Sequence, residues 1–185
     1  MCTSSLKVRM MAVIDTPRLI KDDARSGTLH GPWPDPWTLT KKEWLDVVEV
    51  FVNGWADGVD AQFISNDDVA SMDLAVNHLV SLGHTRIGLA VGPRRYVPAL
   101  RKISGFTESM KQHLGVSDPE RWIECSVFSV EGGAAAAERL LDRGASALIC
   151  GSDLMALGAI RAVRLRGLDV PKDVSVVGYD DSLLV

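Results

Sequence analysis

The chain has 185 residues, of which 46% are hydrophobic and 24% are charged, as in an ordinary soluble globular protein. This composition excludes a disordered, a collagen-like or a disulfide-framework chain, and the length suits one domain better than two full ones. Lys and Arg number 20 against 24 Asp and Glu, so the net charge is −4. That balance argues against a surface built to coat nucleic acid or an anionic membrane.

The cysteines and the apolar runs indicate the cellular compartment. Cys2, Cys125 and Cys150 are widely spaced and include no CxxC pair, which argues against a zinc ribbon, a thioredoxin-type site and an extracellular disulfide framework. No apolar run approaches the ~20 residues that a membrane span needs. The stretch 10–14 is too short for the core of a secretion signal. We therefore expect a cytoplasmic protein.

Residues 1–50 differ from the rest of the chain. They hold four of the eight prolines, and the segment 31–37 (GPWPDPW) can form neither a helix nor a central strand. Within this part, only 10–14 and the start of 44–52 are predicted to be ordered elements. We therefore divide the chain into an atypical, poorly ordered segment at 1–50 and a regular domain at 51–185.

From about Phe63 onward, strands and helices alternate. Apolar periodicity, N-cap residues and glycines predict helices over 69–82, 100–114, 131–143 and 153–166. Short apolar runs predict strands at 63–64, 86–91, 122–128, 147–150 and 174–177. These runs lack polar alternation, which is typical of strands buried on both faces. The pattern predicts an α/β fold, namely a three-layer, Rossmann-like parallel sheet with helices on both faces.

Small and polar residues follow the predicted strands. Ligands bind at the carboxyl ends of parallel strands, where Ser, Asp, Lys and Arg can hydrogen-bond the hydroxyls of a sugar-like ligand. Phe128, predicted to end its strand, is the candidate for an aromatic wall, although it could instead be a core residue. A simpler interpretation of the polar residues is that Ser152 and Asp153 only cap the next helix and that 178–181 is only a turn. The polar residues are Gly92–Arg95, Ser129, Gly151–Asp153 and Gly178–Asp181.

Enzyme motifs are missing from the sequence. It contains no GxGxxG, no GxxxxGK[ST] and no GxSxG, and its histidines show no HExxH. His84 follows a helix-ending glycine and is predicted to be a cap or packing residue. We interpret Asp67, Asp68 and Asp73 as a solvated helix start and not as a metal site. The sequence therefore predicts a protein that is not an enzyme and needs no cofactor or metal.

Five segments of the regular domain are specific when taken together. They are AVNHLVSLGHTRIGLAVG (75–92), RKISGFTESM (101–110), FSVEGGAAAAERLL (128–141), LICGSDLMALGAIRAVRLRGLDVP (148–171) and DVSVVGYDD (173–181). In order and at the expected spacing, these segments resemble the LacI/GalR family of bacterial transcription regulators, over about residues 51–185. The resemblance implies the fold of the periplasmic sugar-binding proteins, in which two Rossmann-like lobes hold an effector between them.

The resemblance also implies roles for four residues. Lys102 stands where the family commonly has an effector-binding arginine, and the change to lysine loses the planar fork that grips two hydroxyls. Ser152 stands at an Asn-or-Ser position, and Asp180 matches an acidic effector contact. Phe128 falls where an aromatic side chain packs on the ligand in some members. The implied effector is a sugar or related polar metabolite, which shifts the affinity of an N-terminal helix-turn-helix for operator DNA in a dimeric repressor.

Residues 1–50 resemble neither that helix-turn-helix, nor a hinge, nor a first lobe, and the chain ends soon after GYDD. We therefore expect a fragment or a truncated reading frame that does not bind operator DNA by itself. The leading hypothesis is the effector-sensing lobe of a transcription repressor. Two competing hypotheses are a periplasmic solute-binding protein of the same fold and an α/β enzyme.

Overall fold

The computed structural model describes residues 50–52 and 62–182. The chain divides into two compact units, Met1–Asn66 and Asp67–Val185. In the first unit, strand β1 (Val50–Val52) pairs in parallel with β2 (Gln62–Ile64). The element expected at 10–14 and nearly all of the segment 1–50 lie outside the described residues, so the boundary at residue 50 stays a prediction.

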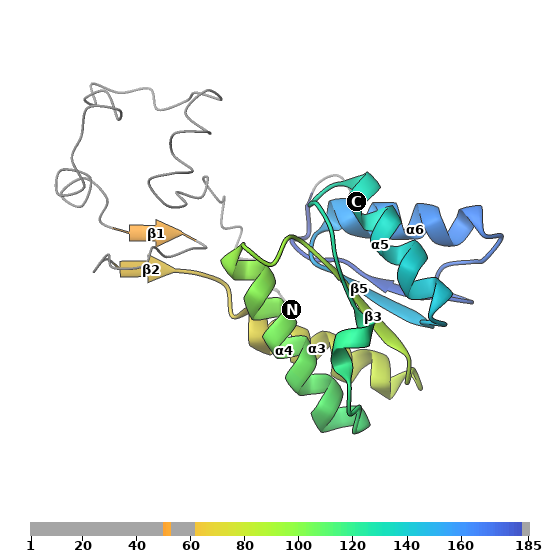
Figure 1. The fold of residues 1–185 in the computed structure, drawn as a ribbon, viewed down its shortest axis with the longest axis horizontal. Coiled ribbons are helices and arrows are strands. Elements are labelled where there is room, and N and C mark those ends of the chain that lie inside the picture. The colour runs from red at the N-terminus through yellow and green to blue at the C-terminus, as the bar shows by residue number, and fades with distance from the viewer. Residues whose placement is uncertain (1–49, 53–61, 183–185) are drawn as a thin grey trace, which may run out of the picture. The chain divides into compact units, whose positions relative to one another are not determined.

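The second unit contains a four-stranded parallel sheet with the strand order β4-β3-β5-β6 (Figure 1). The two central strands, β3 and β5, are buried along their whole length, as their unbroken apolar sequences predict. Leu89 of β3 is in register with Ile123 on one side and with Ile149 on the other. The strands are β3 (Ile87–Val91), β4 (Ile123–Cys125), β5 (Ala147–Cys150) and β6 (Ser175–Val177).

Two pairs of helices cover the two faces of this sheet, α3 with α4 and α5 with α6 (Figure 1). This arrangement confirms the predicted three-layer α/β fold. No helix in the described part of the chain is long and apolar enough to cross a membrane. The helices are α3 (Asp68–Ser81), α4 (Val97–Leu114), α5 (Val130–Asp142) and α6 (Asp153–Leu165), and a short 3-10 helix, η3 (Pro119–Trp122), precedes β4.

Glycines let α5 and α6 approach each other at backbone distance. A Cβ atom at Gly158 would lie 1.9 Å from the carbonyl oxygen of Val130, and one at Gly133 would lie 2.2 Å from that of Met155. Contacts this short leave no room for a side chain at either position. The alanine- and glycine-rich sequence of these helices therefore sets the close spacing of this pair.

His84 ties together the beginnings of three strands at the amino edge of the sheet. The residue lies before β3, and its ring nitrogens contact two serine hydroxyls. Nδ1 is 3.0 Å from Oγ of Ser146, just before β5, and Nε2 is 2.9 Å from Oγ of Ser175, at the start of β6. The predicted packing role therefore takes the form of a side-chain bridge between β3, β5 and β6.

The strand predicted over 122–128 is much shorter in the structure. Trp122 belongs to η3, and β4 ends at Cys125. The backbone N–H of Ser126 still donates to the carbonyl of Val91, but the chain then turns to reach the N-cap of α5 at Ser129. The prediction that Phe128 ends its strand is therefore wrong, because this residue lies in the loop before α5.

Candidate functional site

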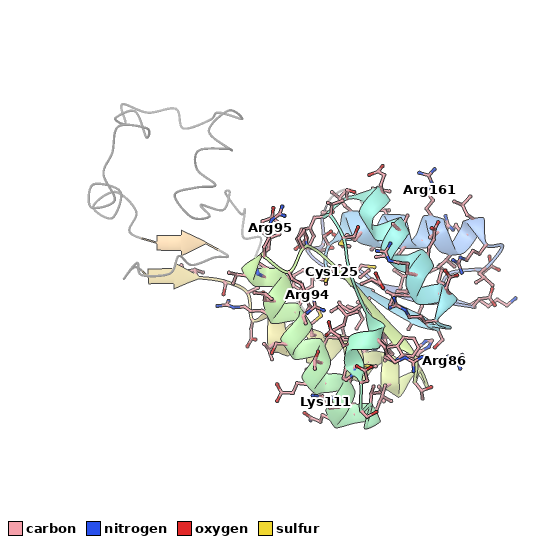
Figure 2. The ribbon with its side chains drawn as sticks, in the orientation of Figure 1. Arg86, Arg94, Arg95, Lys111, Cys125 and Arg161 are labelled. Atoms are coloured by element: carbon pink, nitrogen blue, oxygen red, sulfur yellow. The ribbon has the colours of Figure 1, made fainter. Side chains whose placement is uncertain are left out.

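The carboxyl ends of the four parallel strands meet at one edge of the sheet. The chain leaves β3 at Gly92, β4 at Ser126, β5 at Gly151 and β6 at Gly178, so the loops with the predicted polar residues share this edge. Helices α4, α5 and α6 begin from three of these loops, which directs their N-terminal N–H groups to the same side. Figure 2 shows Arg95 at this edge and Arg86, which precedes β3, at the opposite end of the sheet.

Phe128 and Tyr96 form an aromatic wall at this edge. The Phe128 ring covers Gly92 so closely that a Cβ atom there would lie 1.9 Å from the ring. The ring centroids of Tyr96 and Phe128 are 6.3 Å apart, at an interplanar angle of 47°. Phe128 is 38% exposed, so it is not a core residue. Tyr96 was not predicted from the sequence as a site residue, although its position just before α4 placed it in the same set of loops.

Ser152 is the N-cap of α6. Its Oγ accepts a hydrogen bond from the backbone N–H of Met155 at 3.3 Å, and its side chain is partly exposed. Ser152 therefore caps α6, as the simpler interpretation of the sequence predicted. A serine hydroxyl also keeps a donor and a second lone pair after this contact, so capping leaves it able to bind a ligand hydroxyl.

Asp180 lies in a strained turn that follows β6. Asp180 and Asp181 both have positive φ angles, of 103° and 51°, which residues other than glycine seldom adopt. Conformations of this kind cost on the order of 1–3 kcal/mol each and cluster at functional sites. Partial burial raises the pKa of the Asp180 carboxyl above its ordinary value. The positive charge of Lys102 opposes this rise, and the charges of Asp153 and Asp68 add to it.

Lys102 is buried beneath this turn and already has a partner. Its ammonium Nζ is 2.5 Å from Oδ1 of Asp68, and both residues are buried. The same Nζ lies 3.7 Å from the centre of the Tyr179 ring, and the Tyr179 hydroxyl donates to Asp68 Oδ1 at 2.9 Å. The prediction that Asp68 belongs to a solvated helix start is therefore wrong, because this lysine needs a buried counter-charge.

Asp153 is among the polar residues predicted at this edge, with capping of the next helix as the simpler interpretation. Its two carboxylate oxygens accept hydrogen bonds from the backbone N–H groups of Tyr179 and Ser182, at 3.0 and 2.7 Å. Only the spatial meeting of the loops after β5 and β6 reveals this contact. The charges of Lys102, Asp153 and Asp68 all act on the Asp180 carboxyl, so these four residues are electrostatically linked.

Several groups at this edge are of the kinds that contact hydroxyl groups. The edge offers an aromatic wall, a serine hydroxyl and a partly desolvated carboxylate. Within residues 62–182, no three His, Cys, Asp or Glu side chains are grouped so that they could hold a metal ion. Burial raises the pKa of the Cys150 thiol to about 12, so this cysteine is not a reactive thiolate.

The chain is similar to periplasmic binding protein-like domains and to transcription regulators. A family model of the periplasmic binding protein-like domain matches residues 76–185. The HTH-type transcriptional regulator MalR of Streptomyces coelicolor is 57% identical over 139 residues, which cover 74% of this chain and 40% of the regulator. The chain spans less than half the length of this regulator and of two other curated Streptomyces relatives.

Two solved structures extend this similarity to the fold. A sugar-binding transcriptional regulator of the LacI family from Escherichia coli, complexed with phosphate, is 29% identical with a TM-score of 0.66; the match covers 77% of this chain and 53% of that one. A complex of the transcriptional regulator CelR with cellobiose is 34% identical with a TM-score of 0.65, and covers 72% and 42%. The chain therefore belongs to the family of periplasmic binding protein-like domains, in the form that LacI-family regulators carry as their effector-binding domain.

Proposed function

We propose that the carboxyl edge of the sheet binds a small, neutral, polyhydroxylated effector such as a sugar. The observation that carries this proposal is the turn after β6, which presents a partly desolvated carboxylate, Asp180, in a strained backbone conformation. A carboxylate in such a place forms strong, charge-assisted hydrogen bonds with hydroxyl donors. The related CelR structure, which is a cellobiose complex, supports a sugar as the ligand class.

The contacts follow from the positions of the four residues. Phe128, with Tyr96 behind it, packs on the apolar face of a sugar ring. Ser152 and Asp180 exchange hydrogen bonds with hydroxyl groups. Lys102 is the fourth contact: Asp68 uses one of its three N–H donors, and the others serve a hydroxyl that enters beside the Tyr179 ring.

The wider role is that of the sensing part of a transcription repressor. In this role the chain is not an enzyme, acts in the cytoplasm and responds to its effector within a homodimer, while a helix-turn-helix outside the matched region binds operator DNA. Relatives support this role, because MalR, DegA and PurR are named as HTH-type transcriptional regulators or repressors. One related structure is a lac repressor dimer bound to operator.

The direct test is isothermal titration calorimetry of the full chain with a panel of neutral mono- and disaccharides that includes cellobiose. We expect saturable binding of at least one sugar. The Asp180→Ala variant loses a charge-assisted hydrogen bond, which corresponds to about 1.5–3 kcal/mol, or roughly 10- to 150-fold in affinity.

Asp73→Ala is the matched control. Asp73 is likewise an aspartate, but its carboxylate is hydrogen-bonded to Ser109 and His113, in the last turns of α4. The control should keep the affinity of the unmodified chain. An absence of binding across the panel, or equal affinities of Asp180→Ala and Asp73→Ala, would contradict the proposal.

A further inference from the structure

The turn from Tyr179 to Ser182 has a conformation that its own sequence does not favour. Two consecutive aspartates with positive φ angles, Asp180 and Asp181, occupy its centre. Asparagine and glycine adopt this conformation more readily than aspartate does, and consecutive positions are rarer still. Contacts with the surrounding residues must therefore hold the turn in this conformation.

Asp153 holds the turn by its backbone on both sides of the strained pair. Its Oδ1 accepts from the N–H of Tyr179 at 3.0 Å, and its Oδ2 accepts from the N–H of Ser182 at 2.7 Å. The residue is 7% exposed, so water competes little for these oxygens. It is also the first residue of α6, where the helix dipole stabilises a negative charge. The carboxylate of Asp153 thus bridges the backbone on the two sides of residues 180 and 181.

Gly178 shows how tightly this carboxylate is placed. A Cβ atom on Gly178 would lie 2.6 Å from Oδ1 of Asp153, whereas its next neighbour, Cβ of Ala156, would be at an ordinary 3.5 Å. The φ angle of Gly178 is not positive, so its backbone would accept an alanine. The nearest obstacle to a side chain at this position is therefore the carboxylate of Asp153.

The Tyr179 side chain gives the turn a second attachment, on the other face of the sheet. Its hydroxyl donates to Asp68 of α3, and its ring lies over the ammonium of Lys102 of α4. This attachment fixes the side chain of a residue that precedes the strained pair. The two backbone hydrogen bonds to Asp153, in contrast, lie on both sides of Asp180.

We propose that Asp153 is a positioning residue, which fixes the turn that presents Asp180 at the carboxyl edge of the sheet. It acts through the Tyr179 and Ser182 amides and does not touch the effector. Asp153 fixes the turn whether or not a ligand binds, and only the consequence for binding rests on the function proposed above.

The first test measures the turn without any ligand, by amide hydrogen exchange of the full chain followed by NMR. In Asp153→Ala we expect the Tyr179 and Ser182 amides to exchange at least tenfold faster than in the unmodified chain. In Asp153→Asn we expect a smaller increase, because one oxygen still accepts. Asp73→Asn serves as the control and should leave both amides unchanged. Unchanged exchange in Asp153→Ala, or equal acceleration in the control, would overturn the proposal.

The second test is a double-mutant cycle between Gly178 and Asp153, measured as urea unfolding midpoints. Gly178→Ala should lower the midpoint clearly in the unmodified chain, because the new methyl group displaces the carboxylate. In the Asp153→Ala background the same change should lower it by less than half as much. Equal effects in both backgrounds would show that Gly178 is required for another reason, and this also would overturn the proposal.

The third test connects the turn to binding, with cellobiose and the best sugar of the panel as probes. We expect Asp153→Asn to weaken binding by a factor of about 10, while Asp73→Asn binds as the unmodified chain does. If no sugar binds, the proposed function fails, and the exchange data and the cycle alone decide the positioning role. If a sugar binds and Asp153→Asn binds it as tightly as the unmodified chain, the positioning role fails although the proposed function stands.

Discussion

Replacement of Lys102 by methionine tests the buried ion pair beneath the site. The substitution keeps most of the apolar stem but removes the ammonium, so Asp68 remains buried with no opposite charge 2.5 Å away. Breaking a buried pair in this way costs about 3–5 kcal/mol. The Tyr179 hydroxyl still donates to Asp68, so we expect the lower end, about 3 kcal/mol. Total stabilities of about 5–15 kcal/mol leave the variant folded.

The assay is urea unfolding followed by circular dichroism at 222 nm. With a slope of about 2 kcal/mol per molar urea, a loss of about 3 kcal/mol lowers the midpoint by about 1.5 M. The double variant Lys102→Met with Asp68→Asn removes both charges and should recover about half of that loss, since the uncompensated charge is gone. A midpoint shift below about 0.5 M for the single variant, or no recovery in the double variant, would refute this reasoning.

Three further predictions concern other contacts. Gly158→Ala places a methyl group against the Val130 carbonyl and should cost about 1–3 kcal/mol, measured by urea unfolding. Ser152→Ala removes the N-cap of α6 and should cost about 1 kcal/mol by the same measurement. The hydrogen bond from His113 holds the pKa of Asp73 below its ordinary value, so this carboxylate stabilises the fold above the ordinary pKa of an aspartate. That contribution is lost as the pH falls through the lowered pKa, and melting curves from pH 6 to pH 3 should show a smaller decline in Asp73→Asn.

The periodic part of the sequence predicted the elements well because each helix and strand carries its own boundary signal. The strand at 147–150 was predicted to the residue, and Gly83 marks the end of α3 just beyond Ser81. The strand predicted over 122–128 was too long, because Val127 and Phe128 are apolar but lie beyond β4, and Phe128 contacts Tyr96 in the loop. An apolar run records burial or contact, and neither is the same as strand pairing.

The candidate site was predictable only where a residue follows a strand. Asp180 and Ser152 fit that rule. Lys102 could be placed by resemblance, but its pairing with Asp68 spans 34 positions along the chain and has no local signature. The hydrogen bonds from the turn after β6 to Asp153 also have no local signature. The donors are backbone amides, which every residue except proline possesses.

The glycine contacts between α5 and α6 have a mechanical consequence. Two helices locked at backbone distance cannot slide or tilt independently without a clash. Their first turns, capped by Ser129 and Ser152, start from neighbouring loops at the edge where the effector is proposed to bind. A displacement of the start of α6 should therefore move α5 as well. We expect the two helices to move as one rigid unit.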